Sequence, residues 1–407
     1  MEMKNIVFLL MSVVAVSFAA SNIRPNIERA ASTLDSGATY ATVPGEFIVR
    51  FASDNINAEL GNELSIRGVK TATSIGERIF RVEFQQELTL EEAQSRLGGL
   101  ADLVESNIVV RASEISRRFA TMDDVNKRPS YLAAINLAPL IIVQPAQSKK
   151  KLVVVADSGI NGSYVGLVGK VNSALSQSCV DSQPLFDASG HGTTIAQVIN
   201  DIAPNGVEFV GLKILLPNGN GTTYGSLDCL VWAINIIAAW SRPAIVNLSL
   251  QGYPASQIVR EAMEKVQNRV FFALIAGNFS TNPVSFPGFY AYELPNALCV
   301  ASAEIDGQKS PYSNWGTRAE IAAFGTLSPS LWGTSFASPQ IVGVSVLLQQ
   351  LGDFSPGLQK KIVLVGGRYE PALAGMIGDS TRQLNGLKID GGGGAQTLSR
   401  LQKIRLL

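Results

Sequence analysis

The feature that most constrains the fold is an alternation of short apolar segments with helix-like segments, which begins near residue 151. The apolar segments have the length of strands and end in small or polar residues, at 152–156, 207–214, 244–250, 269–276 and 297–301. Helical patterns lie between them or after them, at 191–200, 226–240, 256–268 and from Ser335 to about Leu351. This alternation predicts an α/β fold, with a doubly wound, mostly parallel sheet and helices on both of its faces.

A different pattern comes before this one, between residues 45 and 113. Strand-like segments are predicted at 45–51, 78–84 and 103–110, and helices at 56–67 and 89–100. The second helix opens with Thr89, which can cap it, and with Glu92, which can reach back to the cap. We predict a small α+β unit with a ferredoxin-like order of elements. Residues 20–44 are rich in Ser, Thr, Ala and Asn without a sustained period, and a flexible lead-in is expected there.

The N-terminus has the order of features of a secretory signal peptide. Lys4 is followed by an apolar run over 6–18 and then by small residues. Cleavage after Ala19 leaves small residues at both required positions, so the prediction is a signal peptide at 1–19 and an extracellular mature protein. The alternative is a membrane anchor, but the run is shorter than the ~20 residues that a spanning helix needs.

Composition excludes several classes of function. Lys plus Arg and Asp plus Glu both number 33, so no net field attracts a nucleic acid or, after signal removal, a membrane surface. With one histidine and no C-x-x-C spacing, no structural or catalytic zinc site is expected. Three cysteines leave at least one thiol unpaired in an oxidising compartment. The pairing among Cys179, Cys229 and Cys299 stays open.

The one histidine, His191, is the obvious candidate for a general base near neutral pH. Asp157 lies at the end of a predicted strand, where α/β folds carry their chemistry, and Ser335 begins a predicted helix. Taken singly, Asp157 is typical of a turn residue and Ser335 of a helix cap. Together, the chain order Asp, His, Ser is one of the known orders of a catalytic triad.

Three motifs surround these residues: VADSG at 155–159, GHGT at 190–193 and GTSFASP at 333–339. They resemble the three active-site signatures of the subtilases, the subtilisin-like serine proteases of peptidase family S8. The resemblance spans roughly 145–400, and the segment at 385–390 resembles the end of the family's catalytic domain. Residues 45–113 resemble its inhibitory prodomain of the I9 type. The resemblance implies a subtilisin-like catalytic domain at 114–407.

The resemblance implies a secreted serine endopeptidase that works without a cofactor. Ser335 would be the nucleophile, His191 the general base and Asp157 the residue that orients the imidazole. Asn278 would donate to the oxyanion of the tetrahedral intermediate. Alternatively, Asn278 is a turn residue, or a glycosylated one, because it opens an Asn-Phe-Ser sequon.

The resemblance also implies that substrates bind by adding a strand to an edge segment. The substrate-binding residues implied are Ser249, Leu250, Gln251, Gly252, Ala276, Gly277 and Ser285. Gln251 stands where the family usually has glycine. Since these segments carry no charge, a preference for uncharged, in particular apolar, side chains before the cleaved bond is expected. The stretch 198–210 lacks the family's inserted calcium loop, although structural calcium elsewhere stays open.

The unit at 45–113 would serve as an intramolecular chaperone and inhibitor whose tail lies in the substrate cleft. Self-cleavage near Ser113 would give a monomeric enzyme that begins at about Glu114. A convertase acting at Arg117-Arg118 is the alternative. For the unit at 45–113, the alternative is an independent binding domain. For the activity, the alternatives are a catalytically silent subtilase-like peptide-binding protein and a peptide ligase on the same fold.

Overall fold

The computed structural model of the chain describes residues 23–35, 38, 40–53, 58–112, 150–217, 222–328, 331–378 and 382–383. The predicted signal peptide, Ser113 with the alternative cleavage site, and the segment at 385–390 lie outside the described residues. Within the described ranges, no helix combines the length and the apolar character that crossing a membrane requires.

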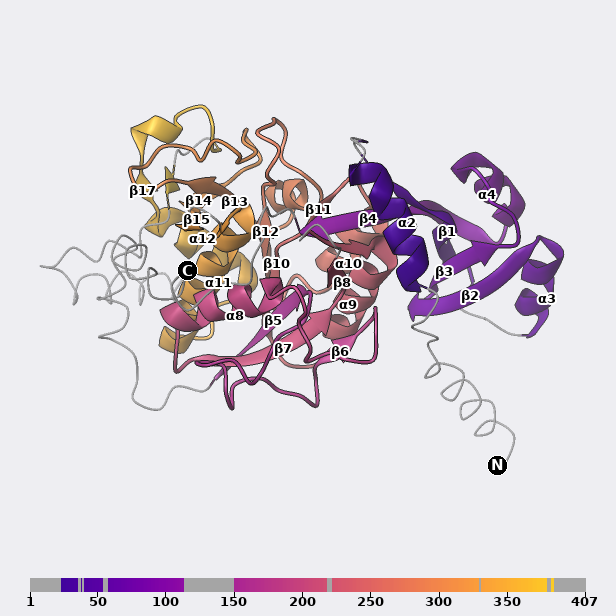
Figure 1. Cartoon of the computed structure of the whole chain (residues 1–407), viewed down its shortest axis with the longest axis horizontal. Helices are drawn as coiled ribbons and strands as arrows, with labels where there is room; N and C mark the ends of the chain where they lie inside the picture. The colour runs from indigo at the N-terminus through magenta and orange to yellow at the C-terminus, as the bar shows by residue number, and fades with distance from the viewer. Residues whose placement is uncertain are drawn as a thin grey trace, which may run out of the picture.

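A nine-stranded sheet forms the centre of the larger unit (Figure 1). Its strands lie in the order β17-β18-β14-β13-β12-β10-β5-β7-β6, and only the β17–β18 pair is antiparallel. The inner strands are β5 (Lys151–Asp157), β7 (Val207–Lys213), β10 (Ala244–Leu248), β12 (Val270–Ile275) and β13 (Ala297–Ala303). The outer strands are β6 (Gln177–Ser178), β14 (Ile321–Phe324), β17 (Arg368–Tyr369) and β18 (Arg382–Gln383). The predicted mostly parallel sheet is confirmed.

Helices cover both faces of this sheet because successive side chains of a strand point to opposite sides. Leu152 and Val154 of β5 join one hydrophobic core, and Val153 and Val155 join the other. The first core includes α9 (Leu227–Ala239) and α10 (Gln257–Lys265). The second includes α8 (His191–Ile202), α11 (Thr334–Leu351) and α12 (Pro356–Gly366). Each fully buried Val or Leu contributes about 1.5–3 kcal/mol, so a sheet apolar on both faces requires both layers.

The N-terminal unit has the predicted mixture of strands and helices. Its antiparallel sheet has the order β2-β3-β1-β4. The strands are β1 (Thr42–Phe51), β2 (Val69–Gly76), β3 (Ile79–Phe84) and β4 (Ala101–Ala112), and the helices are α3 (Ala58–Ile66) and α4 (Leu90–Leu97). The predicted capping box is confirmed: the Thr89 hydroxyl accepts from the Glu92 N–H at 3.3 Å, and the Glu92 carboxylate accepts from the Thr89 N–H at 2.8 Å. Sequence reasoning missed β2.

The expectation of a flexible lead-in is wrong for residues 23–35, which form the helix α2 (Ile23–Asp35). Ile27, Ala30, Ala31 and Leu34 are buried at the spacing of one helix face. They form a core with Val43, Val109 and Tyr224, which come from three other segments. Two of the four buried residues on the helix are alanines, which give a weak apolar signal, so only the tertiary contact reveals this helix.

One strand of the N-terminal unit continues into a sheet of the larger unit. β4 pairs with β1 inside the N-terminal unit, and its last residues pair with β9 (Thr223–Ser226) and β11 (Gln251–Gly252) of the larger unit. β9 pairs in turn with β8 (Leu215–Pro217), so a seven-stranded sheet crosses from one unit to the other. Figure 1 shows β4 reaching out of the indigo and purple N-terminal unit toward β11.

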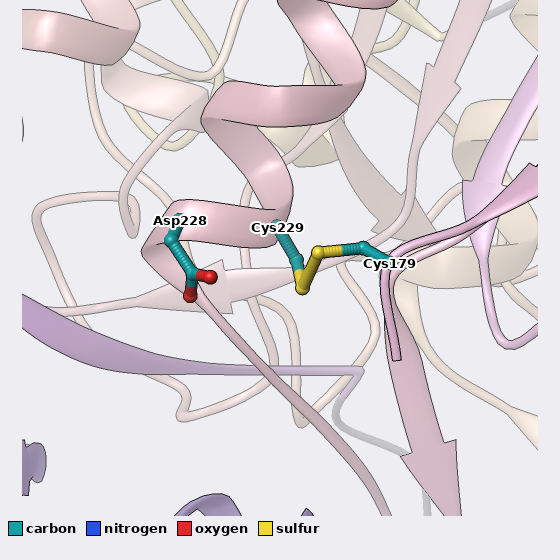
Figure 2. A group of neighbouring side chains, drawn as sticks. All are labelled: Cys179, Asp228 and Cys229. Carbon is teal, nitrogen blue, oxygen red and sulfur yellow. A yellow bond between two sulfur atoms is a disulfide. The ribbon is translucent and has the colours of Figure 1, made fainter. Parts of the chain in front are cut away.

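The pairing of the cysteines, which the sequence left open, is Cys179 with Cys229. Cys299 is free and buried. Figure 2 shows Asp228 beside the disulfide, and the ligand atoms of these three residues lie within 4.8 Å of one another. Both sulfur atoms are already bonded to each other, so this group offers no thiolate to a metal ion.

Candidate active site

Asp157 and His191 form a buried hydrogen-bonded pair. Asp157 is the last residue of β5, and His191 is the first residue of α8. The imidazole Nδ1–H donates to Asp157 Oδ1 over 2.6 Å, and the same oxygen accepts from the Ser158 backbone N–H at 2.7 Å. A carboxylate bound at Nδ1 fixes the tautomer of the ring and leaves Nε2 as the basic nitrogen. The pair has the arrangement of a general base with its orienting acid.

The N-terminus of α8 is held by Asp187, a residue that sequence reasoning missed. One Asp187 carboxylate oxygen accepts from the Thr193 N–H at 2.9 Å and from the Thr193 hydroxyl at 2.6 Å. The other oxygen accepts from the Gly190 N–H at 2.9 Å and from the Ser158 hydroxyl at 2.9 Å. These bonds satisfy N–H groups that a helix start leaves unpaired. An acidic residue just before a predicted helix is the signal that could have identified it.

A glycine lets α8 approach the end of β5. A Cβ atom added at Gly192 would lie 2.2 Å from the carbonyl oxygen of Gly159 and 3.1 Å from Cβ of Asp157. Any larger residue would push the helix away from the strand. The glycine that follows the histidine therefore permits the short distance between Asp157 and the imidazole of His191.

Ser335 lies in the first turn of α11, which packs against α8. Its hydroxyl donates to the Ser249 carbonyl oxygen over a long 3.5 Å, and the Ser249 hydroxyl donates to the Ser335 carbonyl oxygen at 3.0 Å. The next residue, Phe336, has its ring centroid 6.0 Å from that of His191. The fold thus brings Ser335, His191 and Asp157 into one region at the carboxyl ends of the strands, as expected for an α/β fold.

Asn278 follows β12 and is held by Thr334. The Asn278 side-chain oxygen accepts from the Thr334 backbone N–H at 2.8 Å and from the Thr334 hydroxyl at 2.7 Å. Because a backbone N–H can only donate, these bonds identify the oxygen end of the amide and direct its NH₂ end the other way. Sequence reasoning did not identify Thr334, since its contact with Asn278 joins segments 56 residues apart.

The first four residues expected to bind substrate, at 249–252, have different surroundings. Gln251 and Gly252 form β11 and pair with Arg111 and Val110 of β4. Leu250 is instead fully buried in the core. The hydroxyl of Ser249 is used to hold Ser335.

The other expected residues, Ala276, Gly277 and Ser285, lie beside a buried polar network. The Ala276 carbonyl oxygen accepts from the Ser285 N–H at 2.8 Å and from the side-chain amide of Asn314 at 3.1 Å. The Ser285 hydroxyl accepts from that same amide at 2.9 Å. This wall is therefore uncharged but polar, and the expected preference for uncharged side chains stays a prediction. Asn314 was not identified from the sequence, because it reaches the wall from a distant loop.

The end of β4 lies between two strands of the larger unit. Val109 to Ala112 pair antiparallel with β9, and Val110 and Arg111 also pair with β11. The Arg111 guanidinium lies over the ring of Phe279, 4.7 Å from its centroid. An extended segment paired on both sides by its backbone is the geometry of strand addition.

Thr194 and Gln340 have structural contacts near the site. The Thr194 hydroxyl donates to the Gly190 carbonyl oxygen at 2.8 Å, inside α8. The Gln340 side-chain amide donates to the carbonyl oxygens of Phe324 and Phe336. Both side chains therefore stabilise backbone near the site.

Comparison with known proteins adds to this geometry. The model of the Subtilase family matches residues 148–363, which is more than half of the chain. Alkaline serine exoprotease A of Vibrio alginolyticus is 28% identical over 248 residues, covering 57% of this chain and 44% of that protein. Subtilisin-like protease 6 of Trichophyton verrucosum is 26% identical over 377 residues, covering 81% of this chain and 88% of that protein. The chain thus spans less than half of the first relative and most of the second.

Solved structures share the fold. Fervidolysin from Fervidobacterium pennivorans, a keratinolytic enzyme related to subtilisin, aligns with a TM-score of 0.66 at 16% identity. That alignment covers 85% of this chain and 61% of fervidolysin. The epidermin leader peptide processing serine protease from Staphylococcus aureus aligns with a TM-score of 0.63 at 12% identity. That alignment covers 85% of this chain and 98% of the Staphylococcus aureus protein. The predicted subtilisin-like fold is confirmed.

Proposed function

This chain belongs to the subtilase family of serine proteases, and on that premise we propose that it is a secreted, monomeric serine endopeptidase made as a self-processed zymogen. His191 takes the proton of Ser335 as the hydroxyl attacks the scissile carbonyl, and then protonates the leaving amine. Asp157 orients the imidazole and stabilises its protonated form. The observation that carries the proposal is the buried 2.6 Å hydrogen bond between His191 and Asp157.

Asn278 supplies the side-chain donor to the oxyanion of the tetrahedral intermediate, and the backbone N–H of Ser335 supplies a second donor. The support is the pair of hydrogen bonds from Thr334, which hold the oxygen end of the Asn278 amide. A donor held in place before the reaction needs no reorganisation when charge develops. Loss of the corresponding donor in subtilisin costs about 10² to 10³ in turnover, and we expect a similar loss for Asn278→Ala.

The N-terminal unit inhibits the enzyme until it is cut and removed. The support is the position of the β4 end between β9 and β11, where an extended substrate would pair by the same backbone groups. Self-cleavage near Ser113 would give a mature chain starting at about Glu114. N-terminal sequencing of the secreted protein checks this, because a start beyond Phe119 would favour cleavage at Arg117-Arg118 by a convertase.

The proposed chemistry uses protein groups alone. A structural calcium ion is a separate question, and the melting temperature with and without a chelator addresses it. A melting temperature that falls in the chelator and recovers on addition of calcium would establish a structural ion. An unchanged value would indicate a fold stable without one.

Fluorophosphonate labelling tests the activity directly, since the probe reacts with activated serine nucleophiles. The secreted protein is labelled beside its Ser335→Ala variant, and the chain sizes are read on the same gel. Labelling together with loss of the N-terminal unit is expected in the wild type only. An unlabelled wild type that stays unlabelled after removal of residues up to Ser113 would instead indicate a silent peptide-binding protein. A labelled enzyme whose products are joined peptides would indicate a ligase.

A further inference from the structure

Gln251 occupies an unusual position at the edge where β4 is bound. It is fully buried, and its backbone pairs with that of Arg111. Its side-chain oxygen accepts from the Asn278 backbone N–H at 3.2 Å and from the Ser285 hydroxyl at 3.3 Å. Because a backbone N–H can only donate, the contact with Asn278 fixes which end of the Gln251 amide is the oxygen. The other end, Nε2, therefore points away from both partners.

The Nε2 group of Gln251 is buried and has no hydrogen-bond partner among the described residues. Burying an amide donor without a partner is costly, and such groups in native proteins call for an explanation. An acceptor that arrives with a ligand would satisfy it. Since Gln251 pairs with the bound end of β4 through its own backbone, that ligand would be a peptide taking the place of β4.

Polar side chains surround Gly277 beside Gln251. A Cβ atom added at Gly277 would lie 2.4 Å from the Ser285 hydroxyl oxygen, and 2.5 Å from both the Asn314 amide nitrogen and the Gln251 side-chain oxygen. The Ser285 hydroxyl is also bonded to Tyr253 at 3.1 Å. These side chains fill the region next to Gly277 with a connected polar network. A large apolar side chain would have to break that network to enter.

We propose that Gln251 sets the side-chain preference of the enzyme at the residue before the cleaved bond, an inference that rests on the proposed endopeptidase function. The Gln251 oxygen and its partners close the pocket to large apolar and aromatic side chains. Its Nε2 donates to a small, uncharged side chain with an oxygen acceptor, such as Ser, Thr or Asn. The chain carries a residue of this class, Ser113, at its own proposed cleavage position.

Short fluorogenic substrates test this on the self-processed enzyme. The peptides have the sequence Val-Arg-Ala-Xaa, after residues 110–112, with Xaa as Ser, Ala or Phe. We expect kcat/KM for Ser to exceed that for Ala by about tenfold, because a site built around a donor rejects a residue that lacks the acceptor. We expect Phe to be poorer still. Preference for Phe, or equal values for Ser and Ala, would overturn the inference.

Two variants test separately whether the Gln251 side chain acts as a hydrogen-bond donor and whether its volume restricts the pocket. Gln251→Met keeps the length of the side chain but removes the donor, so the Ser to Ala ratio should fall to about one while Phe stays poor. Gln251→Gly opens the pocket, so the rate for Phe relative to Ser should rise at least about tenfold. Ratios between substrates are compared, because loss of the bond to Asn278 would slow every substrate alike. An unchanged Ser to Ala ratio in Gln251→Met would overturn the role of the donor.

Self-processing of the full chain gives a readout that does not depend on Gln251 variants folding. Ser113→Thr should release the N-terminal unit at about the wild-type rate, whereas Ser113→Ala and Ser113→Phe should release it at least about tenfold more slowly. Equal rates for all three would count against the inference. Wild-type protein that takes up no fluorophosphonate and cleaves no peptide would defeat the proposed function and the inference together. Labelled protein that lacks the preference defeats the inference alone.

Discussion

Thr334 holds the side-chain oxygen of Asn278 with two hydrogen bonds, from its backbone N–H at 2.8 Å and from its hydroxyl at 2.7 Å. Thr334 begins α11, which carries Ser335, and Asn278 follows β12. The residue next to the proposed nucleophile therefore orients the proposed oxyanion donor.

Replacing Thr334 by Val removes the hydroxyl and keeps the backbone bond. Loss of one hydrogen bond of about 1.4 kcal/mol corresponds to about a tenfold lower kcat, with KM unchanged if the bond acts mainly in the transition state. Steady-state kinetics measure both values. Thr334→Ser, which keeps the hydroxyl, is the matched control and should stay near the wild type. A Val variant with wild-type kcat would show that the backbone bond alone is enough.

Replacing Asp187 by Ala should both destabilise the protein and lower its activity. Its carboxylate accepts bonds from Gly190, Thr193 and Ser158 at the start of α8. Loss of a helix cap and of charge-assisted hydrogen bonds costs about 1–3 kcal/mol. Denaturant unfolding measures the stability, and kcat/KM reports the position of His191. Asp187→Asn keeps one acceptor oxygen, so its stability and its kcat/KM should lie between those of the wild type and of Asp187→Ala. If Ala matched the wild type in both measurements, Asp187 would not position the helix.

The cysteines predict a distinct pattern of thiol reactivity. Cys179 and Cys229 form a disulfide, and burial raises the pKa of the Cys299 thiol well above its usual value. Because thiol reagents attack the thiolate, the native protein should show no reactive thiol and the unfolded, non-reduced protein should show one. Mass spectrometry after alkylation counts them. Two or more thiols in the non-reduced protein would contradict the pairing.

Removing the disulfide should lower the free energy of unfolding. The Cys179→Ser/Cys229→Ser double variant is expected to lose about 2–4 kcal/mol, because the bond restricts the unfolded chain. Denaturant unfolding of the mature protein measures the loss. The Cys299→Ala variant is the comparison, because it removes one buried sulfur atom that is not part of the disulfide. A double variant as stable as the wild type would mean that native strain offsets the constraint.

The association of the N-terminal unit with the enzyme should weaken as the pH rises. Burial, and then the charge of Asp228, raise the pKa of Glu46, and burial raises the pKa of Glu105 despite its bonds to Ser256 and Gln257. A carboxyl group with a raised pKa in the complex favours binding while it is protonated. Binding should therefore be strongest below the ordinary value of 4.5 and weaken through the window above it.

Calorimetric titration measures this dependence at a series of pH values, with the separate N-terminal unit added to the Ser335→Ala enzyme from which residues up to Ser113 have been removed by an added protease. Glu46→Gln removes one of the titrating groups and should flatten the pH profile. Glu91→Gln is the matched control, because Glu91 is an exposed residue of α4 and should leave the profile unchanged. Affinity that rises with pH would contradict the prediction.

The sequence was sufficient for features whose signal lies within one segment. The buried strand β12 is a continuous apolar run, and so is the part of β5 between Lys151 and Asp157, which is the composition of a strand buried on both faces. The capping box at Thr89 and Glu92 needs only residues three apart. The motifs around Asp157, His191 and Ser335 pointed to a triad because the three residues occur in one of the known chain orders of a triad, and the fold then brought their segments together.

Other features depend on contacts between distant segments, which no local pattern contains. The helix α2 forms against Val109 and Tyr224, and its own alanines gave too weak a signal to predict it. The pairing of Cys179 with Cys229, the bonds from Thr334 to Asn278 and the turn of the Gln251 amide toward Ser285 each join residues far apart in the chain. The sequence by itself determined which chemical groups the protein has and on which elements they lie. Only the tertiary structure decided the partners of these groups. The reason is that a local sequence pattern does not distinguish between the possible partners in distant segments, whereas packing brings particular segments into contact.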